Sequence, residues 1–351
     1  MDRTGESPGR LSRRQFARRT AELGLCVAGL AVLSGCSRLS APIAPARGGD
    51  PTLETTRLRL DPLSICGAPQ VVAEELLRAE GFTDIQYRVV PNLSAREALV
   101  AGELDLDVQF AAPSIIRVDA GDPIVFLAGV HVGCFEVFGS DQVRTLSDLK
   151  GRSAAVGAVG AVGHVLLSTM LAYVGLDPQR DVRLIHAPSA EGIQLFTAGQ
   201  TDAIIGTPPL PQRIREAGYG RVIMNSSLDR PWSQYFCCML AGNRQFVQQN
   251  PEATRRAMRA LLKATDICAA DPAGAARIVV DKGYPARYEH VLQALQSIPY
   301  SKWREYDPED TIRFYSLRLH DVGMIKSSPN TILRDGTDWR YLNELKRELK
   351  T

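Results

Sequence analysis

A short pattern of residues occurs twice in this 351-residue chain, at an interval of 97 positions. An Ala-Gly pair, an Asp three residues after the Gly and a second Ala-Gly pair make up the pattern. The first copy is Ala101-Gly102, Asp105 and Ala120-Gly121, and the second is Ala198-Gly199, Asp202 and Ala217-Gly218. Ala-Gly is typical of a helix end, because glycine adopts the left-handed conformation that closes a helix. The pattern therefore predicts one α/β unit that the chain builds twice.

Apolar runs and helical patterns alternate within each half of this repeat. The first series extends from Leu58 to Ala128 and the second from Ala154 to Met224. Short connections between such elements favour parallel strands with helices on the faces of the sheet. The sequence thus predicts an α/β protein with two lobes, each a mainly parallel sheet flanked by helices, and a ligand cleft between the lobes.

The last third of the chain departs from this alternation. Residues 233–241 indicate a strand that crosses back, and Asn250-Pro251-Glu252 has the cap, proline and acid that begin a helix. The remainder is mostly helical and amphipathic, so it should pack on the first lobe. The predicted bounds are residues 56–140 with 229–351 for lobe I and residues 141–228 for lobe II, with crossing strands near Gly139 and Tyr235.

Residues 1–35 have the features of an export signal. Ser12-Arg13-Arg14-Gln15-Phe16 is a twin-arginine pattern, and an apolar run over residues 23–33 follows it. This run is shorter than the roughly 20 apolar residues that span a bilayer. The segment ends in Leu33-Ser34-Gly35-Cys36, which resembles a bacterial lipobox and implies cleavage before Cys36 and lipidation of its thiol. A buried helix at the start of the fold is the alternative interpretation.

Residues 36–55 are rich in Pro, Ala, Ser and Gly, which is typical of a flexible tether. We therefore expect an exported protein that a lipid anchor holds at the periplasmic face of a bacterial membrane. Residues 1–35 contain six of the 41 basic and three of the 39 acidic residues, which leaves 35 and 36. This balance gives no reason to expect nucleic acid as a partner.

Five cysteines remain beyond Cys36, at positions 66, 134, 237, 238 and 268. Neither a C-x-x-C pair nor a Cys/His spacing typical of zinc sites is present in the sequence. We therefore predict no metal and interpret these cysteines as small buried apolar residues. The sequence does not decide whether two of them form one disulfide bridge.

Ligands of parallel α/β sheets bind outside the carboxyl ends of the strands. The predicted loops at these ends are small and apolar, and His164 is the basic side chain among them. They comprise residues 66–69, 110–113, 157–164, 187–190 and 207–209. Backbone N–H groups at helix N-termini favour a single negative charge. The ligand predicted from these loops is a monoanion or a neutral polar heterocycle.

Residues 157–163 (GAVGAVG) also invite a dinucleotide-binding interpretation. The glycines recur every third residue, however, and His186 stands where an acidic residue would end the next strand. We therefore predict no nicotinamide cofactor, and no other cofactor. A ligand-binding loop and close packing of a helix on a strand both remain open for these glycines.

Several segments together resemble a known family. These marks are Leu146-Ser147-Asp148-Leu149-Lys150-Gly151, Ala198-Gly199-Gln200-Thr201-Asp202-Ala203, and Phe246-Val247 before Asn250-Pro251-Glu252. Over residues 56–350 the chain resembles the substrate-binding lipoproteins of nitrate, sulfonate, taurine and bicarbonate ABC importers, which share their fold with proteins that bind thiamine-pyrimidine precursors. The resemblance implies a type II periplasmic-binding-protein fold whose lobes close on one small solute. It also implies delivery of that solute to a membrane permease.

Candidate ligand-binding residues follow from the predicted loops and from this resemblance. They are Gly67, Ala68, Phe110, Ala111, Ala112, His131, Val159, Gly160, Val162, Gly163, His164, Thr207, Pro208 and Pro209. Relatives more often carry Ser or Thr in these loops, so the identity of the solute stays open.

A monomeric binding protein without catalytic activity is the first hypothesis. The second is an enzyme of the same fold, like the pyrimidine synthases that use pyridoxal phosphate, and it requires a cleft lysine that forms a Schiff base. The predicted loops contain no lysine. A third hypothesis, a subunit that presents its solute to a sensor instead of a permease, has the same sequence features.

Overall fold

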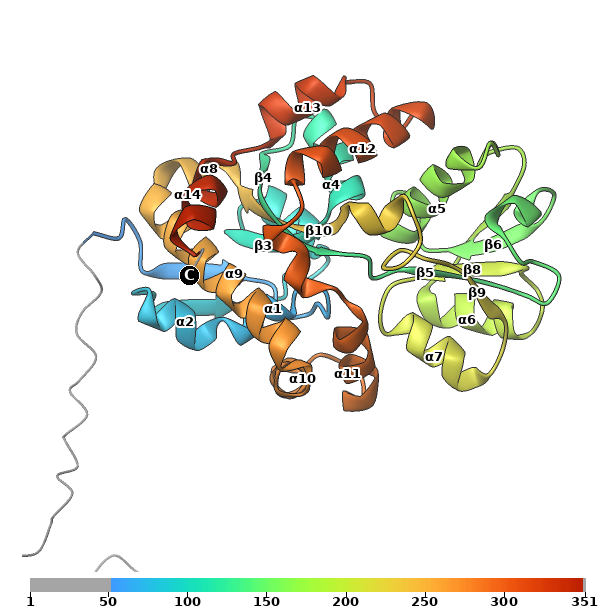
Figure 1. The fold of residues 1–351 in the computed structure, drawn as a ribbon, viewed down its shortest axis with the longest axis horizontal. Coiled ribbons are helices and arrows are strands. Elements are labelled where there is room, and N and C mark those ends of the chain that lie inside the picture. The colour runs from blue at the N-terminus through green and yellow to red at the C-terminus, as the bar shows by residue number, and fades with distance from the viewer. Residues whose placement is uncertain (1–51, 350–351) are drawn as a thin grey trace, which may run out of the picture. The chain divides into compact units, whose positions relative to one another are not determined.

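The computed structural model describes residues 52–349 of the chain (Figure 1). The twin-arginine segment, Cys36 and most of the predicted tether lie outside the described residues. None of the helices within residues 52–349 combines the length and the apolar character needed to span a membrane.

Strands and helices alternate in the described chain as the repeat predicted. The strands are β1 (Arg57–Leu60), β2 (Asp84–Tyr87), β3 (Leu106–Phe110), β4 (Ile124–Val132), β5 (Glu136–Gly139), β6 (Ser153–Val156), β7 (Arg183–His186), β8 (Ala203–Gly206), β9 (Arg221–Asn225) and β10 (Phe236–Asn243). The helices of the repeated units are α1 (Ala68–Val72), α2 (Glu74–Ala79), α3 (Ala95–Val100), α4 (Ala111–Asp119), α5 (Val162–Tyr173), α6 (Ser189–Thr197) and α7 (Leu210–Ala217).

Helices dominate the chain after β10, as predicted. They are α8 (Arg244–Gln249), α9 (Pro251–Ala270), α10 (Pro272–Asp281), α11 (Tyr288–Ser297), α12 (Pro308–Asp321), α13 (Pro329–Gly336) and α14 (Arg340–Glu348). Three short 3-10 helices complete the described elements: η1 (Leu146–Leu149), η2 (Trp232–Gln234) and η3 (Tyr300–Arg304). Helix α9 packs on α1 and α2, and α12 packs on α4, so this region covers the first lobe.

The strands form separate sheets in the two lobes. In the first lobe β1 pairs with β2 in parallel, and β10 lies between β3 and β4, antiparallel to both. In the second lobe the strand order is β7-β6-β8-β5-β9, with β5 antiparallel to β8 and β9. Helices α5, α6 and α7 gather around this five-stranded sheet (Figure 1). The α/β prediction is confirmed, with one antiparallel strand in the larger sheet of each lobe.

The repeated aspartate makes the same backbone contact in both lobes. In the first, the amide of Arg59 donates to Asp105 Oδ2 at 2.7 Å, and the amide of Asp105 donates back to the carbonyl of Arg59 at 2.9 Å. In the second, the amide of Ser153 donates to Asp202 Oδ2 at 2.9 Å, and the amide of Asp202 returns a bond of 3.1 Å. Each aspartate therefore ties the start of the third strand of its repeated unit to the first strand of that unit, β3 to β1 and β8 to β6.

The Ala-Gly pairs have the predicted function at helix ends. Gly102 and Gly199 have φ values of 71° and 69°, and each donates its amide to a carbonyl three residues earlier. A residue with a side chain seldom adopts this left-handed conformation, which explains the choice of glycine.

Two chain segments connect the lobes, residues 133–135 and residues 226–235. Ser226 Oγ accepts hydrogen bonds from the amides of Cys134 (3.1 Å) and Phe135 (3.0 Å), so the two segments lie side by side. At Gly133, where φ is +59°, a Cβ would lie 2.4 Å from the Cα of Ser227. The backbones thus approach too closely for a side chain at this position.

The first connection lies earlier in the chain than predicted. The predicted lobe I, residues 56–140, included β5, whereas the pairing of β5 with β8 and β9 assigns Glu136–Gly139 to the sheet of the second lobe. The predicted crossing near Gly139 therefore belongs at residues 133–135. The bounds predicted at residues 228 and 229 fall within the second connection and stay predictions.

Candidate functional site

The N-terminus of α5 is the centre of the candidate site. The chain leaves β6 at Val156 and enters α5 through residues 157–161, which we call the glycine loop. Ala161 occupies the N-cap position with φ −68° and ψ 161°, and its methyl side chain provides no cap. Within α5, hydrogen bonding begins with Val165, which donates to the carbonyl of Ala161 at 3.0 Å. The preceding amides have no helical partner and can bind a ligand.

A cavity of about 150 Å³ lies at this helix end. It is formed where β6 and β8 end and where α5, α6 and α7 begin. Its walls are largely apolar, and two hydroxyl side chains are among them. The lining residues are Phe135, Gly157, Ala161, Val162, Gly163, Leu166, Ser189, Ile205, Gly206, Thr207 and Leu210. We call this space the α5 cavity.

Three predicted site residues, Val162, Gly163 and Thr207, meet in the α5 cavity. Ser189 was not among the predicted site residues, although its loop was, and its place just after the end of β7 is the signal that could have found it. Gly163 also serves packing, because a Cβ there would lie 3.2 Å from Cγ2 of Ile205. Both interpretations of the glycine loop therefore have a physical basis.

Val159 and Gly160 lie on the other side of the glycine loop. Together with α3 and α4 of the first lobe they line a hollow of about 260 Å³ that also contains Arg96 and Arg117. The Arg96 Nε atom is buried and has no hydrogen-bond partner within residues 52–349. Burial, followed by the charge of Arg117, lowers the pKa of Arg96.

These two arginines were missed because they lie on helices and the prediction considered only loops. Arg117 follows Pro113 by four residues, which places both on one face of α4, and that spacing is the available signal. The loops themselves carry little positive charge, but the first lobe supplies it beside the glycine loop.

Pro208 and Pro209 are half-buried beside Thr207. Pro209 lines a different hollow, of about 520 Å³, which α7 forms with the chain before and within α11. There Glu216 lies 2.5 Å from Arg287 and 3.2 Å from His290 Nε2. An ion pair thus connects a helix of the second lobe with the C-terminal helical region.

The predicted residues of the first lobe lie where β1 and β3 pass into helices. Ala68, Ala111 and Ala112 are buried with at most 1 % exposure, Gly67 is buried, and Phe110 is half-buried. None of them lines the α5 cavity. Their contact with a solute stays a prediction.

Two of the candidate histidines have defined neighbours. His164 lies beside His186, with ring centroids 5.2 Å apart, and its Nδ1 accepts a hydrogen bond of 3.2 Å from the amide of Gly160. Burial and the neighbouring His186 lower the pKa of His164, which favours the neutral ring. His131 is fully buried at the end of β4, away from the α5 cavity.

Folding also brings together residues that sequence spacing did not connect. Cys66, Cys134 and Cys238 meet around His131, and their potential ligand atoms all lie within 4.8 Å of one another. Every cysteine in residues 52–349 is buried and free. The Cys134 thiol and burial raise the pKa of Cys66 to about 11, and burial raises that of Cys134 to about 11. The prediction that these cysteines are only small apolar residues is therefore incomplete.

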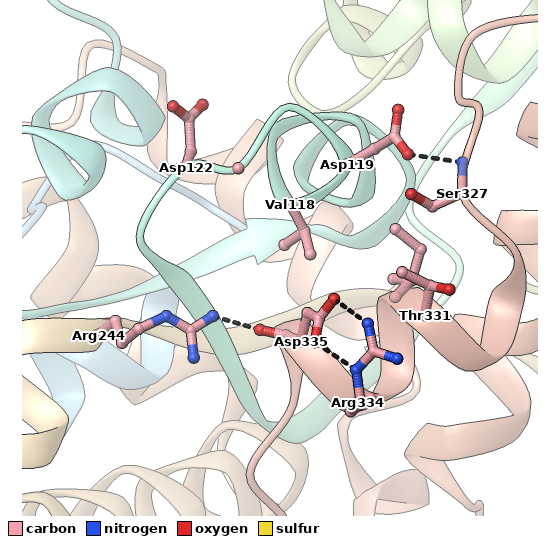
Figure 2. A pocket seen from close by; sticks show the side chains of 10 residues that line it. Val118, Asp119, Asp122, Arg244, Ser327, Thr331, Arg334 and Asp335 are labelled. Carbon is pink, nitrogen blue, oxygen red and sulfur yellow. Dashed lines mark hydrogen bonds and ion pairs between the residues drawn. The ribbon is translucent and has the colours of Figure 1, made fainter.

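A larger hollow, of about 450 Å³, is not the candidate site (Figure 2). It lies between the end of α4 and the start of β4, at the edge of the sheet opposite the carboxyl ends of β3 and β4. Its polar groups already have partners: Asp119 accepts from the amide of Ser327 at 2.8 Å, and Arg334 pairs with Asp335. None of the predicted site residues lines it.

Separate sheets in two lobes, two connections between the lobes and a cavity at the carboxyl ends of strands define the periplasmic-binding-protein fold. The nitrate-binding protein NrtA from Synechocystis PCC 6803 superposes on the chain with a TM-score of 0.71 at 16% identity, over 85% of this chain and 90% of NrtA. The chain belongs to the NMT1-like family, whose profile matches residues 65–281, more than half of its length. The predicted fold and family resemblance are confirmed.

Curated relatives share only part of their length with the chain. A protein of Brucella abortus (strain 2308) named as a binding protein is 27% identical over 204 residues, which cover 58% of this chain and 63% of the relative. The 4-amino-5-hydroxymethyl-2-methylpyrimidine phosphate synthase THI12 of Saccharomyces cerevisiae is 24% identical over 199 residues, covering 53% and 57%. The chain therefore spans about three fifths of the length of these relatives.

Proposed function

We propose that the chain is the extracytoplasmic solute-binding component of an ABC importer. In this role it captures a small monoanionic or neutral polar solute in the α5 cavity and delivers it to a membrane permease. The observation that carries the proposal is the uncapped N-terminus of α5, whose free amides border a small and largely apolar cavity.

The lining of the cavity suits a small organic monoanion. Amides at a helix N-terminus stabilise an anion by about 0.3–1 kcal/mol, and by more where the site is partly buried. The hydroxyls of Ser189 and Thr207 add donors, while Phe135 and Leu166 offer apolar surface. A dry cavity of about 150 Å³ accommodates a molecule the size of benzene. A nitrate-like or sulfonate-like head group with a short apolar substituent fits these limits.

Closure of the lobes would enclose this solute. The two connections between the lobes provide a hinge, and Glu216 on α7 already pairs with Arg287 of the C-terminal region. Arg96 beside the glycine loop, whose Nε atom has no hydrogen-bond partner in the described residues, would attract anions toward the cleft, whereas Arg117 is paired with Asp122. Delivery to a sensor instead of a permease requires the same binding step, and the gene neighbours of the chain distinguish the two partners.

A heterocycle related to the thiamine pyrimidine is the second candidate solute, because synthases of such pyrimidines are among the relatives and the cavity is largely apolar. Catalysis with pyridoxal phosphate would need a lysine at the cofactor, and no lysine is among the residues that line the α5 cavity. A cofactor absorption band in the purified protein would favour the enzyme.

An Ala161→Asp variant tests the proposed site. Its carboxylate would accept hydrogen bonds from the free amides of α5 and act as a helix cap, which stabilises the ligand-free protein by about 0.5–2 kcal/mol. The same carboxylate would repel an anionic solute and occupy its donors. We expect a higher melting temperature without ligand, together with loss of the ligand-induced increase.

The measurement is thermal unfolding with a panel of nitrate, bicarbonate, taurine, alkane- and arenesulfonates, hydroxymethylpyrimidine and flavins. For the wild-type chain, a bound solute at a hundredfold excess over Kd should add about 2.7 kcal/mol of stability. Ala161→Asn introduces a neutral cap. If asparagine reduces the ligand-induced stabilisation less than aspartate does, the solute is an anion. A ligand shift that survives in Ala161→Asp would place the solute elsewhere.

We also propose that the mature protein is a monomer that the twin-arginine route exports and that lipid on Cys36 anchors. Its N-terminal signal and lipobox support this localisation. In a Cys36→Ser variant the protein should leave the membrane fraction for the soluble fraction or keep its signal segment uncleaved. The Cys268→Ser variant should stay in the membrane fraction. Equal distribution of both variants in fractionation would contradict lipid anchoring.

A further inference from the structure

The cluster of Cys66, His131, Cys134 and Cys238 has the composition of a metal site. These residues come from the turn after β1, from β4, from the first connection between lobes and from β10. The three sulfur atoms and a ring nitrogen of His131 all lie within 4.8 Å of one another. Three thiol groups and one imidazole form a donor set that Zn²⁺ prefers in tetrahedral protein sites.

The hydrogen bonds of His131 leave one ring nitrogen available as a ligand. Nδ1 lies 2.9 Å from the carbonyl oxygen of Gly133 and 3.2 Å from that of Val132, so it carries the proton and donates. Nε2 is buried and has no hydrogen-bond partner in the described part of the chain. A histidine that donates through one nitrogen to a backbone carbonyl and keeps the other free is typical of metal ligands.

The backbone around Cys134 supports the same interpretation. Cys134 has a φ of +152°, which is uncommon for a residue with a side chain, and it directly follows Gly133 with φ +59°. The hydroxyl of Ser226 holds its amide at 3.1 Å. Strained conformations of this kind persist at sites where the surrounding structure requires a side chain in one place.

An irregular stretch of β10 positions the sulfur atom of Cys238. The pairing register of β10 with β4 shifts on both sides of Cys238, and such bulges change the direction of a side chain. Cys238 is fully buried, as is His131, while Cys66 and Cys134 are 4% and 7% exposed. Four protein ligands away from solvent correspond to a closed structural site, not to a catalytic site with an open position.

We propose that Cys66, His131, Cys134 and Cys238 bind one Zn²⁺ ion, which links the first lobe to the connection between the lobes. The ion would join the turn after β1, β4 and β10 to residue 134, at the point where the chain leaves the first lobe. This role is structural, and it is independent of the solute and of the permease.

Oxidation of cysteines in this cluster would compete with zinc binding. Cys134 Sγ lies 3.0 Å from Cys237 Sγ, so a disulfide between these residues would remove one ligand. Cys237 is not among the four proposed ligands. A Cys237→Ser variant cannot form this disulfide and should therefore bind zinc at least as well as the wild-type chain.

The test is the metal content of the full chain, purified under reducing conditions and supplied with Zn²⁺. We expect one zinc per chain in the wild type and in Cys268→Ser, whose cysteine is buried in α9 and is not among the four proposed ligands. We expect at least a tenfold lower content in Cys66→Ser and Cys238→Ser. Zinc, but not Mg²⁺, should raise the melting temperature of the wild type.

A spectroscopic readout on the wild-type chain covers the case in which the ligand variants do not fold. Co²⁺ substituted for zinc should show the intense visible bands of a tetrahedral ion with thiolate ligands, and added Zn²⁺ should remove them. Zinc content in the wild type no higher than in Cys66→Ser, or Co²⁺ spectra typical of an octahedral ion with oxygen ligands, would overturn the proposal. So would failure of Cys237→Ser to bind zinc.

Discussion

Replacing Asp105 with alanine is expected to lower the free energy of unfolding by about 3–5 kcal/mol, the range for removing one partner of a buried ion pair. Its carboxylate is fully buried and accepts from the amide of Arg59 at 2.7 Å and from the guanidinium Nη2 of the same residue at 2.5 Å. The guanidinium Nε also donates to this carboxylate. Alanine would leave these donors without their partner, and water would replace few of the lost contacts because the Arg59 side chain is only 18% exposed. Urea denaturation should show a lower midpoint with an unchanged slope.

The second copy of the repeat supplies the matched control. Asp202 makes the corresponding bond to the amide of Ser153, but its side chain is 32% exposed. Water can therefore replace some of its contacts, and we expect Asp202→Ala to cost about 1–2 kcal/mol, near the cost of an unsatisfied donor. If both variants unfold at the wild-type midpoint, the repeated aspartate has no structural role and the explanation of the repeat is wrong.

Replacing Asp107 with asparagine should stabilise the protein at neutral pH. Asp107 lies in β3 with one carboxylate oxygen bonded by Gln109 and the other without a partner in the described chain. Burial, with a contribution from the nearby Asp61, raises the pKa of Asp107 from the ordinary 3.8 to about 8. Between these values the unfolded chain releases a proton that the folded chain retains.

The sign of the pH dependence follows from this difference. Because the folded state binds the extra proton, the wild-type protein loses stability as the pH rises from about 4 to about 8. Asparagine has no such proton. The gain of Asp107→Asn in free energy of unfolding over the wild type should therefore be absent near pH 4 and should grow with rising pH by up to about 1.4 kcal/mol per pH unit. Chemical denaturation at a series of pH values measures it.

Asp141→Asn is the control for this series, since the Asp141 side chain is 97% exposed. This variant should follow the wild-type profile over the whole range. A constant offset for Asp107→Asn at every pH would mean that asparagine acts through its hydrogen bonds and not through the missing charge.

Sequence signals predicted the repeated unit because its helix ends depend on local backbone conformation and because the same pattern occurs twice. Gly102 and Gly199 end helices through their own backbone conformation, and the aspartates three residues later bond to an adjacent strand. Part of the α5 cavity was also predictable: Thr207 directly follows β8, and Val162 and Gly163 begin the helix that follows β6 and the glycine loop, where the topology of a parallel sheet places ligands.

Features that depend on distant pairing were not predictable from the chain alone. The place of β5 in the second sheet follows from its antiparallel partners β8 and β9, which come more than 60 residues later. Likewise, Cys66, Cys134 and Cys238 form no spacing motif, because four separate segments must fold before their sulfur atoms meet His131. Arg96 and Arg117 reach the glycine loop from the other lobe for the same reason.

The bond between the two connecting segments limits how the halves of the molecule can move. Because Ser226 Oγ accepts hydrogen bonds from the amides of residues 134 and 135 of the neighbouring segment, we expect the two backbones to bend together. Two lobes that rotate about a single axis would open the cleft between them along one edge. In the proposed transport role, a solute would therefore enter and leave along the same edge of the cleft, and the proposed permease would contact that edge during release.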